Sequence, residues 1–340
     1  MTEQKTTTRK SNRRQFMKTA GLTAGALFLA GRAPAYSAGT RKLRYIAFVN
    51  RESVWGKPYD FLAQEVDSMS GGELKIEYAG GGEVVSAFDA PETIANGVFD
   101  MCHTANSYFA GRMPSSISLA SGQASVESLY ASGALAAYDE ILQAQHGLKL
   151  LGVPLSGVGY IFQVAGKPEN LTYYKGKKIR SIPLYDAILE ELGATPVTTS
   201  PAEAYTSMER GIVAGLGWPE LGLTDFKFYE QAKYVMAPSF YQLRTATLIN
   251  PNSFASLPEP LQQVLLDASK SADLIGATWT KEKRDAEYAE MAENGVEIVT
   301  LADAQAQQFV QMTEDKLWSR IVELDAEAGN RLKPLFDKAA

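Results

Sequence analysis

Arg180 is the residue of this sequence best suited to bind a small anion. It lies near the end of a predicted strand over residues 177–182, and open α/β sheets bind their ligands at the carboxyl ends of their strands. A guanidinium group is planar, and its N–H fork can pair with both oxygens of a carboxylate. We therefore expect Arg180 to bind an organic acid. The alternative is a solvated arginine that follows Lys177 and Lys178.

Other polar and aromatic side chains stand near predicted strand ends. Trp218 closes a predicted strand over residues 212–218, just before Pro219. An indole ring there would form an apolar wall of a ligand site, although core packing would explain it too. The further candidate ligand-binding residues, for each of which a structural role is an equal alternative, are Tyr160, Gln163, Asn106, Tyr108 and Tyr241.

The sequence offers little for catalysis or metal binding. Its single cysteine, Cys102, lies in an apolar run, which indicates a buried side chain rather than a nucleophile. The two histidines, His103 and His146, are too few for most histidine-based metal sites, and His103 is a further candidate to line a cleft. No hydrolase, zinc-protease or phosphate-loop motif occurs. We expect a protein that is not an enzyme and that uses no cofactor.

These residues need a sheet to position them, and the sequence predicts two. Strands alternate with helices in two β-α-β units, as in mainly parallel α/β sheets. Helices follow after Pro258, over residues 261–294 and 302–338. The expected strands and helices of the two units cover residues 43–50, 58–70, 73–79, 88–96 and 99–104, then 177–182, 184–192, 195–198, 200–211 and 212–218.

Two such units predict two α/β lobes, with the chain crossing between them near residues 155–160 and 243–248. We expect the first lobe to hold residues 36–157 and 246–285. The second lobe then holds residues 158–245 and 286–340, and a long helix braces both.

The start of the chain reads as an export signal. Arg13 and Arg14 are followed by Phe16 and Lys18, then by an apolar stretch and an Ala-Pro-Ala sequence that ends at residue 35. This layout is typical of a bacterial signal peptide of the twin-arginine type. The alternative is an ordinary signal with two adjacent arginines. We expect residues 1–35 to direct the protein to the periplasm.

Charge argues against nucleic acid as a partner. Residues 1–35 hold seven of the 33 basic and one of the 39 acidic residues, which leaves a net charge of −12 for residues 36–340. Binding nucleic acid requires a basic face. An anionic ligand must therefore be held by local positive charge.

Several spaced motifs resemble those of the DctP-type solute-binding proteins of TRAP transporters, nearest to the branch that binds 2-oxo acids. They are the runs at 88–90, 97, 100–105, 108–112, 176–180, 192–197, 203–205, 209–211 and 218–219. The resemblance implies a periplasmic-binding-protein-like fold, hinge strands and a ligand trapped between two lobes. It also implies a membrane permease driven by an ion gradient, and it matches Arg180 to the family's carboxylate-binding arginine.

The sequence departs from that branch at two positions. Where the branch carries a glutamine and a glutamate that hold a metal ion, this chain has Gly159 and Gly217. We expect no metal site of that kind. The two glycines are also expected to open space for a larger, aromatic or branched acid.

Other readings of the same fold remain open. The chain could serve an ATP-driven importer or a periplasmic sensor, because fold does not fix function. Leu317, Ile321, Leu324 and Leu332 form an apolar stripe. The stripe would serve a homodimer, or it would pack on the chain's own lobes as a monomer.

Overall fold

The computed structural model describes residues 40–340, except the side chains of residues 201 and 202. The expected export signal over residues 1–35 lies outside this part. None of the helices described there combines the length and the apolar character that crossing a bilayer requires.

The first sheet has five strands in the order β2-β1-β3-β10-β4. Alternate residues of β1 point to opposite faces, so Leu43, Tyr45 and Ala47 pack against Leu62 and Val66 of helix α1. The strands are β1 (Arg41–Ala47), β2 (Leu74–Gly80), β3 (Met101–Ala105), β4 (Lys149–Gly152) and β10 (Thr245–Ile249). The helices around them are α1 (Lys57–Ser70), α2 (Ala90–Ala95), α3 (Val126–Ser132), α4 (Ala134–His146) and α7 (Pro251–Ala255), with short 3-10 helices η1 (Val54–Gly56), η2 (Asn106–Phe109) and η3 (Pro114–Ala120).

The second sheet has six strands in the order β11-β9-β5-β8-β6-β7. Helix α6 begins with a capping box, in which the Glu203 carboxylate accepts hydrogen bonds from the backbone N–H and the hydroxyl of Ser200, at 3.1 and 2.8 Å. The strands are β5 (Tyr160–Val164), β6 (Lys178–Ser181), β7 (Thr195–Thr198), β8 (Gly215–Pro219), β9 (Tyr234–Phe240) and β11 (Glu297–Thr300). The helices are α5 (Asp186–Glu191), α6 (Pro201–Glu209), η4 (Leu171–Tyr174) and η5 (Phe228–Glu230).

One strand in each sheet departs from the parallel pattern. β10 is antiparallel to β3 and β4, and β5 is antiparallel to β8 and β9. Both strands carry the chain directly from one sheet to the other, without the helical crossover that a parallel connection needs. The expectation of mainly parallel sheets therefore holds for the β-α-β units and fails for these two strands.

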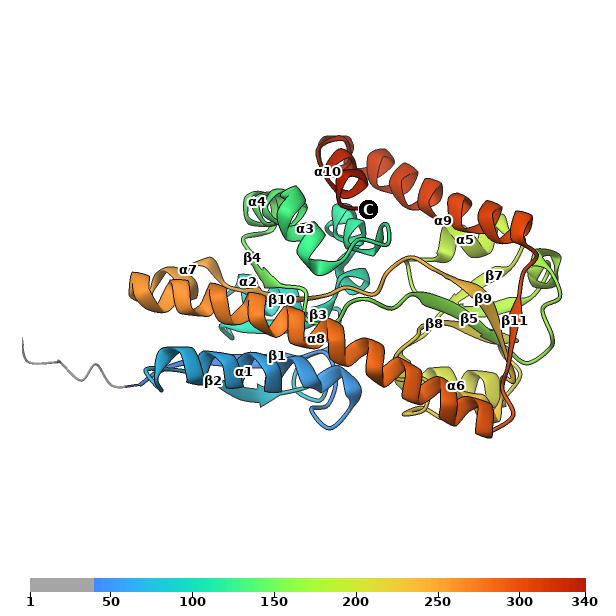
Figure 1. Ribbon diagram of the computed structural model, residues 1–340, viewed down its shortest axis with the longest axis horizontal. Helices are drawn as coiled ribbons and strands as arrows, with labels where there is room; N and C mark the ends of the chain where they lie inside the picture. Colours follow the sequence, from blue (N-terminus) through green and yellow to red (C-terminus); the bar gives the residue numbers. More distant parts are fainter. Residues whose placement is uncertain (1–39) are drawn as a thin grey trace, which may run out of the picture. The chain divides into compact units, whose positions relative to one another are not determined.

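Long helices connect the two sheets (Figure 1). Helix α8 (Glu259–Glu293) packs along α1 and β4 and then reaches the loop after β8. There the Glu287 carboxylate accepts hydrogen bonds from the N–H groups of Gly222 and Leu223, at 3.1 and 2.7 Å. The helix expected over residues 261–294 is confirmed as the brace of both sheets.

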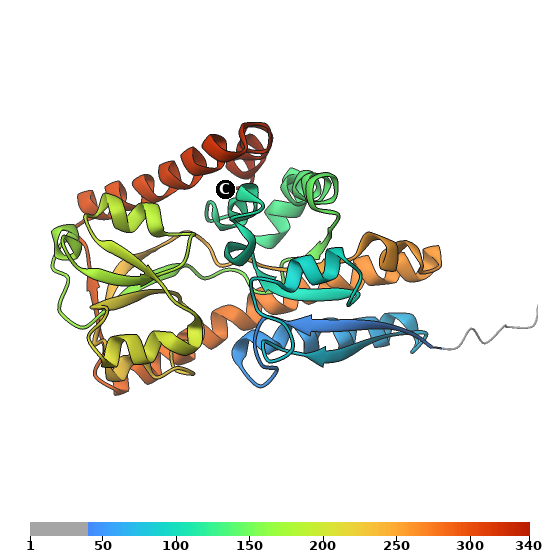
Figure 2. The same cartoon turned by 180° about the vertical axis from the view of Figure 1, so that it is seen from behind.

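The helical tail differs from the expectation in two respects. The run over residues 302–338 is broken at Asp325 into α9 (Asp303–Leu324) and α10 (Ala326–Ala339), because the Asp325 side chain caps α10 by accepting from the N–H of Ala328 at 3.0 Å. Helix α10 packs on α3 and α4, beside the first sheet, whereas we expected residues 286–340 to belong to the second lobe. Figure 2 shows α9 and α10 from behind.

The apolar stripe of this tail packs inside the same chain. Leu317, Ile321 and Leu332 are buried in the main core, and only Leu324 is exposed. The stripe therefore packs on the chain's own lobes, which is one of the two alternatives that the sequence left open.

Candidate functional site

A small cavity of about 30 Å³ lies where the carboxyl ends of β1, β3, β6 and β8 meet. Open α/β sheets bind ligands at such ends. Aromatic and aliphatic side chains dominate the lining, and Arg180 is its only charged residue in the part of the chain described. The lining residues are Phe48, Val49, Trp55, Ala105, Ser107, Tyr108, Tyr160, Arg180, Ile182, Tyr185, Trp218, Pro219, Phe226 and Leu243.

Arg180 is held by neutral partners. Its side chain extends from β6, and the residue is only 2% exposed. Nη1 donates to the hydroxyl of Tyr185 and to the carbonyl oxygen of Gly217, both at 3.1 Å, and Nη2 donates to the carbonyl oxygen of Thr199 at 2.9 Å. These bonds fix the plane of the guanidinium group and leave its positive charge unneutralised.

In the part of the chain that the structure describes, no acidic side chain pairs with that charge. None of the ion pairs formed by residues 40–340 involves Arg180. The buried Nε–H also has no hydrogen-bond partner among these residues. A buried charge without a counter-ion is costly, and a bound anion would remove that cost.

Aromatic rings form the walls around this charge. The guanidinium carbon of Arg180 lies 4.9 Å from the ring centre of Trp218, within cation–π distance. The Trp218 ring meets Trp55 edge-on with ring centres 6.5 Å apart, and Phe48 lies 5.6 Å from Tyr108. Trp218 and Tyr108 thus line the cavity, where we expected them.

The hydroxyl groups in the lining are protonated hydrogen-bond donors. Burial raises the pKa of Tyr108 and of Tyr160, and it raises that of Tyr185 against the opposing effect of Arg180. Among residues 40–340, the buried hydroxyl of Ser107 has no hydrogen-bond partner. The hydroxyls of Ser107, Tyr108 and Tyr160 can donate to a bound anion in addition to Arg180. The hydroxyl of Tyr185 cannot, because it already donates to the carbonyl oxygen of Gly217.

Three of the predicted residues do not line this cavity. Gln163 lies on β5 three positions after Tyr160, so it points to the opposite face, where its amide donates to the carbonyl oxygen of Ala232 at 2.9 Å. The Asn106 amide donates to the carbonyl oxygen of Arg244. Tyr241 lines a different cavity.

His103 is also not part of the lining. It is fully buried on β3 against Phe48, with ring centres 5.5 Å apart. Burial lowers the pKa of His103 to about 3, so the imidazole is neutral. Cys102 beside it is buried, as expected.

The expectation that Gly159 and Gly217 open space is wrong. A Cβ atom on Gly217 would lie 2.5 Å from Cε2 of Tyr185, and one on Gly159 would lie 2.5 Å from Oγ of Ser239. The space beside each glycine is therefore already filled. The two glycines therefore provide no room for a larger acid.

The residues at these positions do not fit a metal ion held as in the 2-oxo-acid branch. Glycine supplies no side-chain oxygen at position 159 or 217. The nearby carboxylate of Glu220 already accepts from the N–H of Gly159 at 2.7 Å and from the hydroxyl of Tyr288 at 2.9 Å. Within residues 40–340 no cluster of three or more His, Cys, Asp or Glu side chains has metal-binding geometry.

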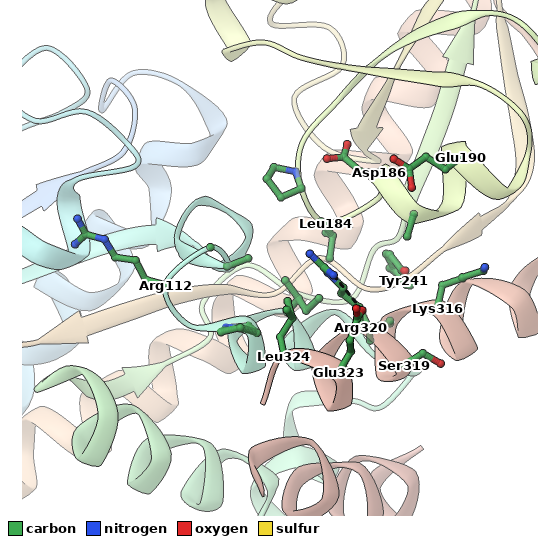
Figure 3. Close-up of a pocket in the computed structure, with 17 residues that line it drawn as sticks. Arg112, Leu184, Asp186, Glu190, Tyr241, Lys316, Ser319, Arg320, Glu323 and Leu324 are labelled. Carbon is green, nitrogen blue, oxygen red and sulfur yellow. Dashed lines mark hydrogen bonds and ion pairs between the residues drawn. The ribbon is translucent and has the colours of Figure 1, made fainter. Parts of the chain in front are cut away.

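A second cavity of about 860 Å³ is larger but chemically less suited to hold an acid (Figure 3). It lies between α5, α9 and the segment from Ala110 to Ile117. Its three cations within residues 40–340 are already paired with acidic side chains: Arg112 with Glu92 at 2.5 Å, Arg320 with Glu323 at 3.0 Å and Lys316 with Glu191 at 2.7 Å. We therefore take the small cavity with its unpaired arginine as the candidate site.

Sequence reasoning did not single out ten of the lining residues, and the aromatic and polar ones among these are Phe48, Trp55, Ser107, Tyr185 and Phe226. Phe48 and Ser107 stand at or just beyond the ends of β1 and β3. The strand-end rule that selected Arg180 would have found these two. Trp55, Tyr185 and Phe226 lie farther along the loops, and only the folded loops bring them to the cavity.

The chain resembles known binding proteins in sequence and in fold. Residues 47–323 match the family described as bacterial extracellular solute-binding protein, family 7 (DctP). An uncharacterized protein of Salmonella typhimurium is 26% identical over 76% of this chain and 81% of its own length. The 2,3-diketo-L-gulonate-binding periplasmic protein of Escherichia coli is 25% identical over 83% of this chain and 88% of its own length.

A solved structure has the same two-lobed fold. It is a TRAP periplasmic solute-binding protein of Colwellia psychrerythraea with bound calcium and pyruvate, with a TM-score of 0.78 at 19% identity, covering 88% of this chain and 94% of that one. The predicted family and the two-lobed α/β fold are confirmed. The chain belongs to family 7 of the bacterial extracellular solute-binding proteins, the DctP family.

Proposed function

We propose that this protein captures a small carboxylate in the cavity around Arg180 and delivers it to the membrane permease of a TRAP transporter. The observation that carries the proposal is the buried guanidinium of Arg180, which has only neutral partners among the described residues. These bonds use Nη1 and Nη2, whereas Nε–H donates to no group among the described residues. The edge that Nε forms with Nη2 suits the paired oxygens of a carboxylate.

Binding requires movement because the cavity holds only about 30 Å³. We propose that the lobes, carried by the two sheets, separate to admit the acid and close around it. The ligand shifts this equilibrium only by its greater affinity for the closed form. The hinge then lies where the two crossing segments pair, at Ser156 and Arg244.

The relatives support both the ligand class and the partner. The Escherichia coli relative is named for binding 2,3-diketo-L-gulonate, and the Colwellia structure holds pyruvate. Both ligands are carboxylic acids. The matched family and these structural neighbours are binding proteins, so we propose a transport role without catalysis, in the periplasm, after export by the twin-arginine signal of residues 1–35.

A thermal-shift screen of the purified protein against organic acids, sugars, amines and peptides tests this proposal. An acid present at about 100 times its dissociation constant should stabilise the protein by about 2.7 kcal/mol. The shift should disappear in Arg180→Ala and persist in Arg320→Ala, whose arginine lies in the second cavity and pairs with Glu323. Binding of a sugar or amine instead of any acid would contradict the proposal.

A further inference from the structure

Tyr185 lines the candidate cavity and contacts Arg180. Its side chain is fully buried, just before helix α5. The hydroxyl donates to the carbonyl oxygen of Gly217 at 2.7 Å and accepts from Nη1 of Arg180 at 3.1 Å. The ring lies against β8 so closely that a Cβ atom on Gly217 would be 2.5 Å from Cε2.

Tyr185 also determines which side of the Arg180 guanidinium group can meet a ligand. Tyr185 and Gly217 both accept from Nη1, and because their oxygens lie 2.7 Å apart they are on the same side of that nitrogen. This side of the guanidinium group is therefore closed to a ligand. The open edge carries Nε–H, which has no hydrogen-bond partner among residues 40–340. A carboxylate that docks on that edge leaves the rest of the acid in the cavity that the Tyr185 ring lines.

The remaining walls define the body of the acid. Trp218, Trp55 and Phe48 present aromatic surface, and Arg180 supplies the only charge among the described lining residues. A second carboxylate or an amine on the ligand would lose its hydration without gaining a counter-ion, which is costly. The site thus favours a single negative charge on an apolar body.

We propose that Tyr185 is a specificity-determining residue that restricts the ligand to a small, singly charged carboxylate with an apolar body. The ring limits the length of the body, and the hydroxyl holds the guanidinium fork in place. This inference rests on the proposed function, because it assumes that the acid binds at Arg180.

Calorimetric titration with propionate, butyrate, hexanoate, benzoate and succinate tests the inference. The wild-type protein should bind propionate and butyrate more tightly than hexanoate and benzoate, and succinate weakest. In Tyr185→Ala the preference for propionate over hexanoate should fall by at least about tenfold, since each added methylene gains about 0.8 kcal/mol when room exists. Tyr185→Leu should give a smaller change of the same sign if the alanine variant does not fold.

Two further variants separate the effect of the Tyr185 ring on ligand size from the effect of its hydroxyl on the orientation of the guanidinium group. Tyr185→Phe keeps the ring and loses the hydroxyl, so affinity should fall about three- to tenfold for every acid while the order of acids is unchanged. Tyr138→Leu removes a fully buried tyrosine of α4 that does not line the cavity, and it should leave the order and the affinities unchanged.

The outcomes distinguish this inference from the proposed function. An unchanged order of acids in both Tyr185→Ala and Tyr185→Leu, with binding still lost in Arg180→Ala, would overturn the role of Tyr185 and leave the function standing. Tight binding of succinate by the wild-type protein would overturn the single-charge class. Absence of any acid binding would overturn both proposals.

Discussion

A carboxylate oxygen of Asp225 accepts a hydrogen bond from the backbone N–H of Val54 at 3.3 Å. Val54 lies in η1, after the first strand of the first sheet, and Asp225 lies in the loop after β8 of the second sheet. Nearby, the ring of Trp55 in η1 meets that of Trp218 in β8 edge-on, with ring centres 6.5 Å apart. These contacts join the two sides of the cavity that holds Arg180.

Replacing Asp225 should weaken ligand binding although Asp225 does not line the cavity. Asp225→Ala removes one hydrogen bond of the closed form, and such a bond contributes about 0.5–1.5 kcal/mol. Affinity should therefore fall roughly two- to tenfold, chiefly through faster dissociation. Stopped-flow release of the acid found in the screen measures this. Lys227→Ala, an exposed change two residues away in the same loop, is the control. Equal release rates for Asp225→Ala and the wild-type protein would show that the contact contributes nothing to closure.

Exchanging Arg180 for lysine should be almost as damaging as removing it. An ammonium group cannot reproduce the planar fork or its bonds to Tyr185, Gly217 and Thr199. We expect Arg180→Lys and Arg180→Ala each to lose about 2–4 kcal/mol of binding free energy, as when a desolvated charge pair is broken. Calorimetry measures the loss. A tenfold or smaller loss in the alanine variant would contradict the assignment.

A methyl group at position 217 should displace the ring of Tyr185 and so disturb the site. The Cβ atom of Gly217→Ala would lie 2.5 Å from Cε2 and 2.8 Å from Cζ of Tyr185. Overpacking of this kind costs about 1–3 kcal/mol of unfolding free energy, and a displaced Tyr185 would also shift Arg180. Urea unfolding and ligand titration should therefore both show a loss. Gly111→Ala, whose Cβ atom would have no neighbour within 4 Å, should be neutral in both assays.

Asp273 should make the protein less stable as the pH rises. Burial raises the pKa of Asp273 from 3.8 to about 7, although the N–H of Val153 and the hydroxyl of Tyr130 oppose the rise. Between these pH values the folded chain keeps a proton that the unfolded chain releases, so the unfolding free energy falls with rising pH, by up to roughly 4 kcal/mol.

Urea unfolding at several pH values between 4 and 8 measures this dependence. Asp273→Asn, which cannot ionise, should lose the part of the dependence that Asp273 causes. Asp285→Asn removes an exposed carboxylate of the same helix and should behave as the wild-type protein does. A pH dependence of equal size in Asp273→Asn would show that another group is responsible.

The sequence by itself determined the family, the helices and strands of the β-α-β units, the long α8 and the place of Arg180. These features depend on short-range patterns. The period of apolar residues, the Ser200–Glu203 cap and the position of Arg180 at a strand end can all be read within a few residues.

Only the tertiary structure decided which side chains face the ligand cavity. Gln163 and Asn106 turn to backbone carbonyls elsewhere, and Tyr185 fills the space beside Gly217. The sequence also did not predict that β5 and β10 run antiparallel to their neighbours, or that α10 packs on α3 and α4. Each of these depends on partners far away in the sequence, because the direction of a side chain at the end of a strand is set by what packs against it and not by its neighbours in the chain.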